Sequence, residues 1–160
     1  MTSPVLSRLD YCNSLLSGIP QQLIDKLQKV QNYCAGLISK TFKRTHVSPL
    51  LARLLWLPIA QKIDYKIYSF CYDVLGTAPL FLFDLIHLYV SSRSLRSSAD
   101  NRIFRIPKQK QKFQGQRAFY HLGPVTWNKL SYSVRHAHTK FQFKTQLKNT
   151  LFCSVYEPDS

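Results

Sequence analysis

Three features of the 160-residue sequence predict a mainly α fold, built as a small helical bundle followed by a smaller basic α+β subdomain with a short strand or hairpin. Two long segments repeat their apolar residues at helical spacing. Hydrophobic residues form 45% of the chain, and Gly and Pro number only 5 and 8, so the chain can bury a core. The last third is rich in Lys and Arg and holds one segment that alternates like a strand.

The longest predicted helix covers residues 21–40, with Pro20 at its start. Its predicted buried stripe recurs at steps of three and four residues and consists of Leu23, Leu27, Val30, Cys34 and Leu37. The opposite side is expected to face solvent or a partner and carries Gln22, Lys26, Lys29 and Tyr33. A second long helix is predicted over residues 58–75, where a similar apolar stripe runs up to Gly76.

Shorter helices are predicted on either side of these two. One covers residues 7–16 and ends at Gly18, and another begins around Ser48. Segment 79–89 is almost continuously apolar, so it predicts a buried helix at the centre of the core.

The second half of the chain opens with a Ser-rich, polar segment, 91–101, which is predicted to be a linker. Residues 102–107 alternate and predict a short strand with Ile103 on one face and Arg102 and Phe104 on the other. The predicted parts of the chain are therefore residues 1–90, 91–101 and 102–160.

The last predicted helix covers residues 139–152 and opens with a capping signal formed by Thr139 and Gln142. Its expected buried stripe consists of Phe143, Leu147 and Leu151. Lysines recur every four residues on another face and form a cationic ridge of Lys140, Lys144 and Lys148.

No motif of a catalytic or metal site is present in the sequence. The cysteines, which are expected to be free thiols, are separated by 22, 37 and 82 residues, so they do not have the spacing of a zinc site. On a helix, His136 and His138 would point to nearly opposite sides, so they would not share a metal ion there. No apolar run is long enough to span a bilayer and no secretory signal is visible, so we expect an intracellular protein, nuclear or cytoplasmic.

Charge is distributed unevenly along the chain. Residues 1–100 contain 11 basic and 6 acidic residues, whereas residues 101–156 contain 11 basic residues and no acidic one. Aromatic residues are interleaved with these cations, a mixture that suits single-stranded nucleic acid, although any one ring is more often part of a core. The predicted nucleic-acid-binding residues are Arg102, Arg105, Lys108, Lys110, Lys112, Arg117, Lys140, Lys144 and Lys148.

Several segments resemble, in order, the region that follows the polymerase core in LINE-type (non-LTR) retrotransposon reverse transcriptases. The first part of the resemblance consists of SRLDYCNSLLSGIP at 7–20, LQKVQN at 27–32, WLPIAQKIDYKI at 56–67, APLFLFDL at 78–85 and SRSLRSS at 92–98. The remainder consists of GQRAF at 115–119, GPVTWN at 123–128 and FKTQLKNTLF at 143–152.

This resemblance implies that the chain is the C-terminal tail of a longer polyprotein with an endonuclease and a polymerase upstream. It implies a thumb-like, post-polymerase role for residues 1–90. The family's paired-Asp polymerase motif has no counterpart in these residues, so we expect no enzymatic activity, no cofactor and no small-molecule substrate. The implied partners are RNA or DNA, bound without sequence specificity, and the polymerase core of a parent element.

Three hypotheses about function follow. The favoured one is a non-catalytic remnant of a reverse transcriptase tail that binds RNA or DNA through phosphate contacts. The alternative is a helical protein-interaction or structural domain that packed on the missing polymerase core and leaves an apolar surface exposed. A free-standing enzyme ranks last.

Overall fold

The computed structural model describes most of the chain, namely residues 7, 10–11, 13–40, 46–76, 80–90, 102–108 and 118–157. The chain divides into two compact units, of which unit 1 contains residues 1–65 and 148–160 and unit 2 contains residues 66–147. The predicted linker, 91–101, lies outside the described residues, so the predicted boundaries there stay a prediction.

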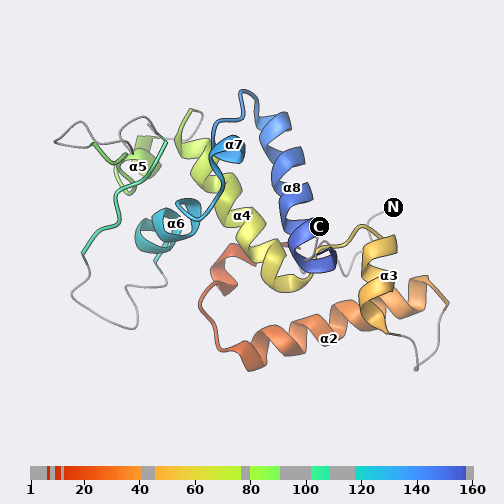
Figure 1. Cartoon of the computed structure of the whole chain (residues 1–160). Coiled ribbons are helices and arrows are strands. Elements are labelled where there is room, and N and C mark those ends of the chain that lie inside the picture. The colour runs from red at the N-terminus through yellow and green to blue at the C-terminus, as the bar shows by residue number, and fades with distance from the viewer. Residues whose placement is uncertain are drawn as a thin grey trace. The chain divides into compact units, whose positions relative to one another are not determined.

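The described elements are helices, which confirms the mainly α prediction (Figure 1). In chain order they are the 3-10 helix η1 (Asn13–Leu16), α2 (Gln21–Ile38), α3 (Val47–Arg53), α4 (Ile59–Val74), α5 (Leu80–Phe83), α6 (Phe119–Trp127), α7 (Tyr132–Arg135) and α8 (Lys140–Tyr156). The predicted helices over 21–40, 58–75 and 139–152 correspond to α2, α4 and α8. Of the helix predicted over 7–16, Ser7 and Asp10 are helical and the Tyr11 N–H donates to Ser7 O at 3.1 Å. Residues 13–16 form η1, and Gly18 follows at a φ of 71°.

The buried face of α2 differs from the predicted stripe. Leu23, Val30 and Leu37 are exposed, so the prediction is wrong at three of its five positions. The residues of α2 that are buried are Gln31, Cys34 and Ala35. Helix α3 packs against α2 in unit 1 (Figure 1).

Two glutamines explain why α2 buries this other face. The Gln31 side-chain amide is fully buried and donates to Leu57 O at 2.9 Å. The Gln28 Oε1 atom accepts from the Ile59 backbone N–H at 2.9 Å. Ile59 is the first residue of α4, and its N–H has no partner within its own helix, so Gln28 caps α4 from a different helix. Satisfying these backbone groups therefore decides which side of α2 faces the core.

Helix α3 ends in a left-handed residue that is not glycine. Leu55 has a φ of 54°, and its N–H donates to Ala52 O at 2.9 Å. The next N–H, of Trp56, donates to Leu51 O at 2.9 Å, which completes a Schellman motif. A left-handed conformation costs an L-residue about 1–2 kcal/mol, and the Leu55 side chain is 61% exposed, so little packing offsets that cost.

Four aromatic rings form the centre of unit 2. The fully buried Trp127 ring lies 5.6 Å from Phe104 and 5.8 Å from Phe143, measured between ring centroids. Tyr72 stacks on Phe143 at 4.2 Å. The Trp127 indole N–H donates to Arg102 O at 2.7 Å, so the polar atom of this buried ring is satisfied.

The strand predicted over 102–107 is reduced to one antiparallel bridge between Leu88 and Phe104. Two backbone hydrogen bonds of 2.8 Å hold the bridge, donated by Tyr89 to Ile103 and by Arg105 to His87. No longer strand forms in the part of the chain that the structure describes.

Asn128 takes the place of a second neighbouring strand. Its Oδ1 atom accepts from the Phe104 N–H at 3.0 Å, and its Nδ2 atom donates to Phe104 O at 2.9 Å. A carboxamide offers both an acceptor and donors, so one side chain satisfies both backbone groups. Phe104 can therefore be buried in an extended segment without a sheet.

The buried helix predicted over 79–89 is wrong in length and in burial. Helix α5 ends at Phe83, whose side chain is exposed, as is that of Leu85. After α5 the chain extends toward the bridge, and Ile86 is the buried residue of this segment. A Cβ atom on Gly123 of α6 would come within 3.1 Å of Ile86 Cδ1. Ile86 can therefore pack closely against α6 because Gly123 has no side chain.

The start of α8 confirms the predicted cap. Thr139 Oγ1 accepts from the Gln142 N–H at 3.1 Å. The Gln142 side chain accepts from the His138 N–H at 3.2 Å, one residue before the position expected of a capping box. Phe143 and Leu147 of the predicted stripe are fully buried.

Replacing Asn128 should destabilise unit 2. In Asn128→Ala the Phe104 N–H and C=O lose their partner, and each unsatisfied group costs about 1–3 kcal/mol, so we expect a loss of about 2–4 kcal/mol. Chemical denaturation followed by circular dichroism measures it. The control is Asn149→Ala on the exposed side of α8, which should change stability by less than about 0.5 kcal/mol. Equal effects of the two variants would contradict this role of Asn128.

Replacing Leu55 with glycine should stabilise the protein. Leu55→Gly relieves the left-handed strain, and the greater freedom of glycine in the unfolded chain offsets part of the gain, which leaves about 0.5–1 kcal/mol. Leu55→Ala keeps the strain and should bring no such gain. The measurement is the thermal midpoint of the three proteins, and a glycine variant no more stable than the alanine variant would argue against stored strain.

Candidate nucleic-acid interface

The structure describes six of the nine predicted contact residues. Lys110, Lys112 and Arg117 lie outside the described residues. The other six form two groups, of which the first, on the segment 102–108, consists of Arg102, Arg105 and Lys108. The second group, Lys140, Lys144 and Lys148, lies on α8 and is called the lysine face below.

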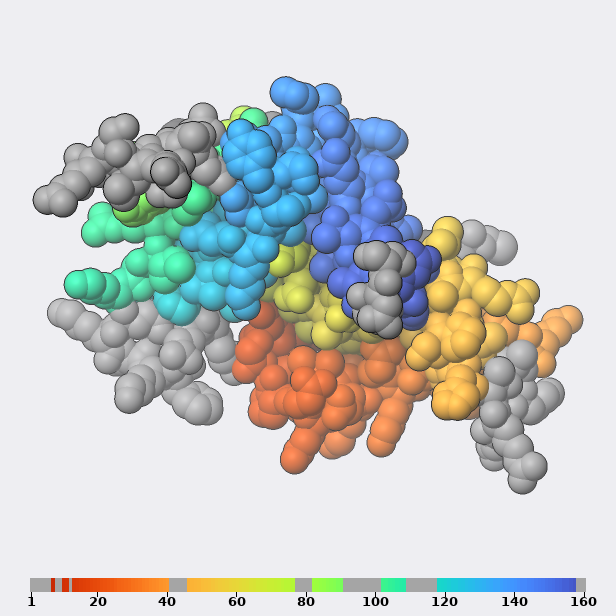
Figure 2. Space-filling model, in the orientation of Figure 1, coloured from red at the N-terminus to blue at the C-terminus, as the bar shows by residue number. Residues whose placement is uncertain are grey.

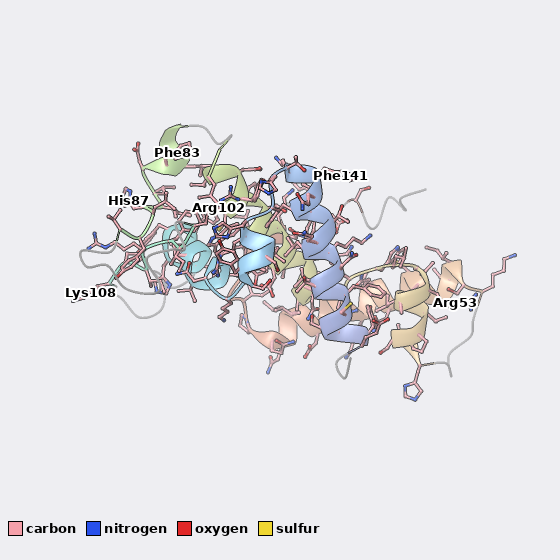
Figure 3. The ribbon with its side chains drawn as sticks, turned by 45° about the horizontal axis from the view of Figure 1, so that its top comes forward. Arg53, Phe83, His87, Arg102, Lys108 and Phe141 are labelled. Atoms are coloured by element: carbon pink, nitrogen blue, oxygen red, sulfur yellow. The ribbon has the colours of Figure 1, made fainter. Side chains whose placement is uncertain are left out.

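Arg102 lies inside unit 2, among its side chains (Figure 3). One terminal nitrogen, Nη1, donates to Arg135 O at 2.8 Å and to Ala137 O at 3.2 Å. The Tyr72 hydroxyl donates to the same Ala137 oxygen at 3.0 Å. Arg102 thus ties its own segment to the connection between α7 and α8. A guanidinium engaged in this way stabilises the fold, so Arg102 is not part of the candidate interface.

Arg105 and Lys108 are exposed on either side of Ile106, which is also exposed. Figure 3 shows Lys108 at the edge of the described side chains of unit 2. These two cations are available to a partner. The other predicted members of their group are not among the described residues.

The lysine face is the more regular of the two groups. All three lysines are exposed, and residues of α8 lie at the molecular surface in Figure 2. Successive members are four residues apart, which places them about 6 Å apart along the helix axis and on one side of it. That separation is shorter than the Debye length of about 8 Å at physiological salt, so their electrostatic fields add.

An acidic partner lies close to one end of the lysine face. Lys140 Nζ is 2.7 Å from Asp73 Oδ1, within unit 2. The charge count over 101–156, which contains no acidic residue, could not predict this ion pair, because Asp73 lies outside that segment, in α4. Lys144 and Lys148 have no ion pair with any residue that the structure describes. The Lys140 side chain is 47% exposed and that of Asp73 is 23% exposed. Solvent screens the lysine end of this pair, so the pair adds little stability and Lys140 can exchange its partner for a phosphate.

The aromatic residues of the basic third separate into core and surface. Phe104, Trp127 and Phe143 are buried, as expected for most rings. Phe141 and Tyr132 are 82% and 58% exposed. Sequence reasoning did not single out these two, since neither the type of the residue nor its neighbours showed that their rings face solvent.

A second cation of the basic third also has a structural role. Arg135 is buried, and its Nη1 atom donates to Asn128 O at 3.2 Å and to Leu130 O at 2.5 Å. Asn128 is the C-cap of α6 and Leu130 lies two residues beyond it, so neither carbonyl has a partner within that helix. The positive charge is therefore balanced by carbonyl dipoles.

The described residues do not form a metal site or a thiol centre. No three His, Cys, Asp or Glu side chains gather where they could hold an ion within the described ranges. Cys34 and Cys71 are buried, and burial raises the pKa of the Cys71 thiol, which keeps it protonated and unreactive. No helix among the described residues is both long enough and apolar enough to cross a membrane.

Comparisons with models of protein families, with curated proteins and with solved structures find no match to this chain.

Proposed function

We propose that this protein is a non-catalytic nucleic-acid-binding module that contacts the phosphates of RNA or DNA through the lysine face of α8. The observation that carries the proposal is the regular exposure of Lys140, Lys144 and Lys148 on one helix. Like charges four residues apart destabilise a helix by about 0.2–0.5 kcal/mol per pair. A polyanion along this face removes that repulsion, and the release of its counterions favours binding.

The proposed binding does not read sequence. Lysine is a point charge on a flexible stem, and phosphate contacts position a nucleic acid without distinguishing its bases. We propose that the module is a remnant of a retrotransposon reverse transcriptase tail, retained in the nucleus or cytoplasm. The support for this origin is the ordered resemblance of segments between residues 7 and 152.

The proposal predicts the salt dependence of binding. In a triple variant with Lys140, Lys144 and Lys148 changed to Gln, the slope of log affinity against log salt for a single strand should fall by about 2 units, from about 0.7 per lost phosphate contact. The control changes three exposed lysines at the other end of the sequence, Lys26, Lys29 and Lys40, to Gln and removes the same charge. Fluorescence anisotropy measures both slopes, and circular dichroism checks the fold. An unchanged slope in the first variant means that the lysine face only contacts solvent.

A second candidate function, protein interaction, is favoured by the exposed apolar side of α2. Leu23, Val30 and Leu37 recur every seven residues along it, and Tyr33 beside them is exposed too. A seven-residue repeat of apolar residues is typical of a helix that packs along another helix. We propose a helical surface, such as that of a polymerase core, as the partner of this side.

Without its partner, this surface should drive weak self-association. Sedimentation velocity at increasing concentration should show it in the native chain, and Val30→Ser with Leu37→Ser should reduce it, because less apolar area is then available. Leu15→Ser, which alters an exposed leucine of η1, is the matched control and should leave association unchanged. A native chain that stays monomeric at every concentration would count against the second candidate.

A further inference from the structure

The most exposed ring in the described part of the basic third lies on the lysine face. Phe141 is in the first turn of α8, and Figure 3 shows its side chain projecting from that turn. Lys144 and Lys148 follow it by three and seven residues, which places them about 60° and 20° from Phe141 around the helix axis. The ring and the cations therefore share one side of the helix.

Neither packing nor a ring contact accounts for the position of Phe141. Its side chain is 82% exposed, and no ring of a described residue stacks on it. Tyr132, the other exposed ring, is already stacked on His136, with ring centroids 4.0 Å apart. One face of Tyr132 is thus occupied, whereas the Phe141 ring is accessible at the edge of the lysine face.

We propose that Phe141 is a stacking platform for a nucleobase, so that the lysine face binds single-stranded nucleic acid in preference to duplex. This inference rests on the proposed function. The lysines hold the phosphates while an unpaired base lies on the ring, a combination that is common in proteins that bind single strands. In a duplex the bases stack on one another and their faces are not available, so only the phosphate contacts remain.

The test compares native protein with variants on a labelled oligothymidylate of about 12 nucleotides, within the usual site size, and on a duplex of equal length. Phe141→Ala should weaken single-strand binding by about 5-fold to 150-fold, the range that corresponds to the loss of one base stack. The salt slope should stay unchanged, because no phosphate contact is lost. Duplex affinity should also stay unchanged.

Two further substitutions separate stacking from apolar contact and from misfolding. Phe141→Leu keeps an apolar side chain without a π face and should lose most of the preference for the single strand. Phe141→Trp has a larger π face and should retain or increase that preference. Tyr33→Ala removes an exposed ring from α2 and is the matched control, which should leave binding to both oligonucleotides unchanged.

The outcomes distinguish this inference from the proposed function. If Phe141→Ala binds the single strand as tightly as the native protein, while the lysine variant still lowers the salt slope, the stacking inference is overturned and the phosphate interface stands. Equal weakening on single strand and duplex also overturns the preference for single strands. If the native protein binds neither oligonucleotide, the proposed function fails and the inference fails with it.

Discussion

The fold of unit 2 depends on hydrogen bonds that two successive residues at the end of α6 make with the extended segment 102–108, which is not part of a sheet. Trp127 donates its indole N–H to Arg102 O, and Asn128 bonds both backbone groups of Phe104. These hydrogen bonds place the Phe104 ring against Trp127 and direct Arg102 toward the carbonyls near α7. The connection that leads into α8 is fixed in turn, because Arg102 and Tyr72 share the Ala137 oxygen. The orientation of the first turn of α8 therefore follows from a few part-buried polar contacts.

The basic third uses its cations in two different ways. Arg102 and Arg135 donate to backbone carbonyls inside unit 2, where guanidinium groups suit several acceptors at once. The lysines of α8 stay at the surface. Net charge alone cannot separate these uses, since it counts a buried arginine and an exposed lysine equally. The division by residue type matches chemistry, because a guanidinium is more weakly hydrated than an ammonium group and is buried at a lower cost.

Periodicity predicted the existence of α2, α4 and α8, because long helices repeat their apolar residues over several turns. It did not predict the buried side of α2, which is set by hydrogen bonds of Gln28 and Gln31 with backbone atoms about thirty residues away. Segment 79–89 is apolar on all sides, so its pattern contained no information about which residues are buried. The lysine face was visible in the sequence as a four-residue repeat. Its partner Asp73 and the exposure of Phe141 were not, because both depend on tertiary packing.

The glutamine cap on α4 has a consequence for how unit 1 folds. The N–H of Ile59 finds its acceptor only when α2 is in place, and the intervening chain loop must close before that bond can form. The first turn of α4 is then not an independent helical segment but part of one cooperative unit with α2. Local opening at the start of α4 would break the hydrogen bonds of Gln28 and Gln31 together. Hydrogen exchange of the Ile59 N–H and of the Gln31 side-chain amide should therefore occur in the same opening event.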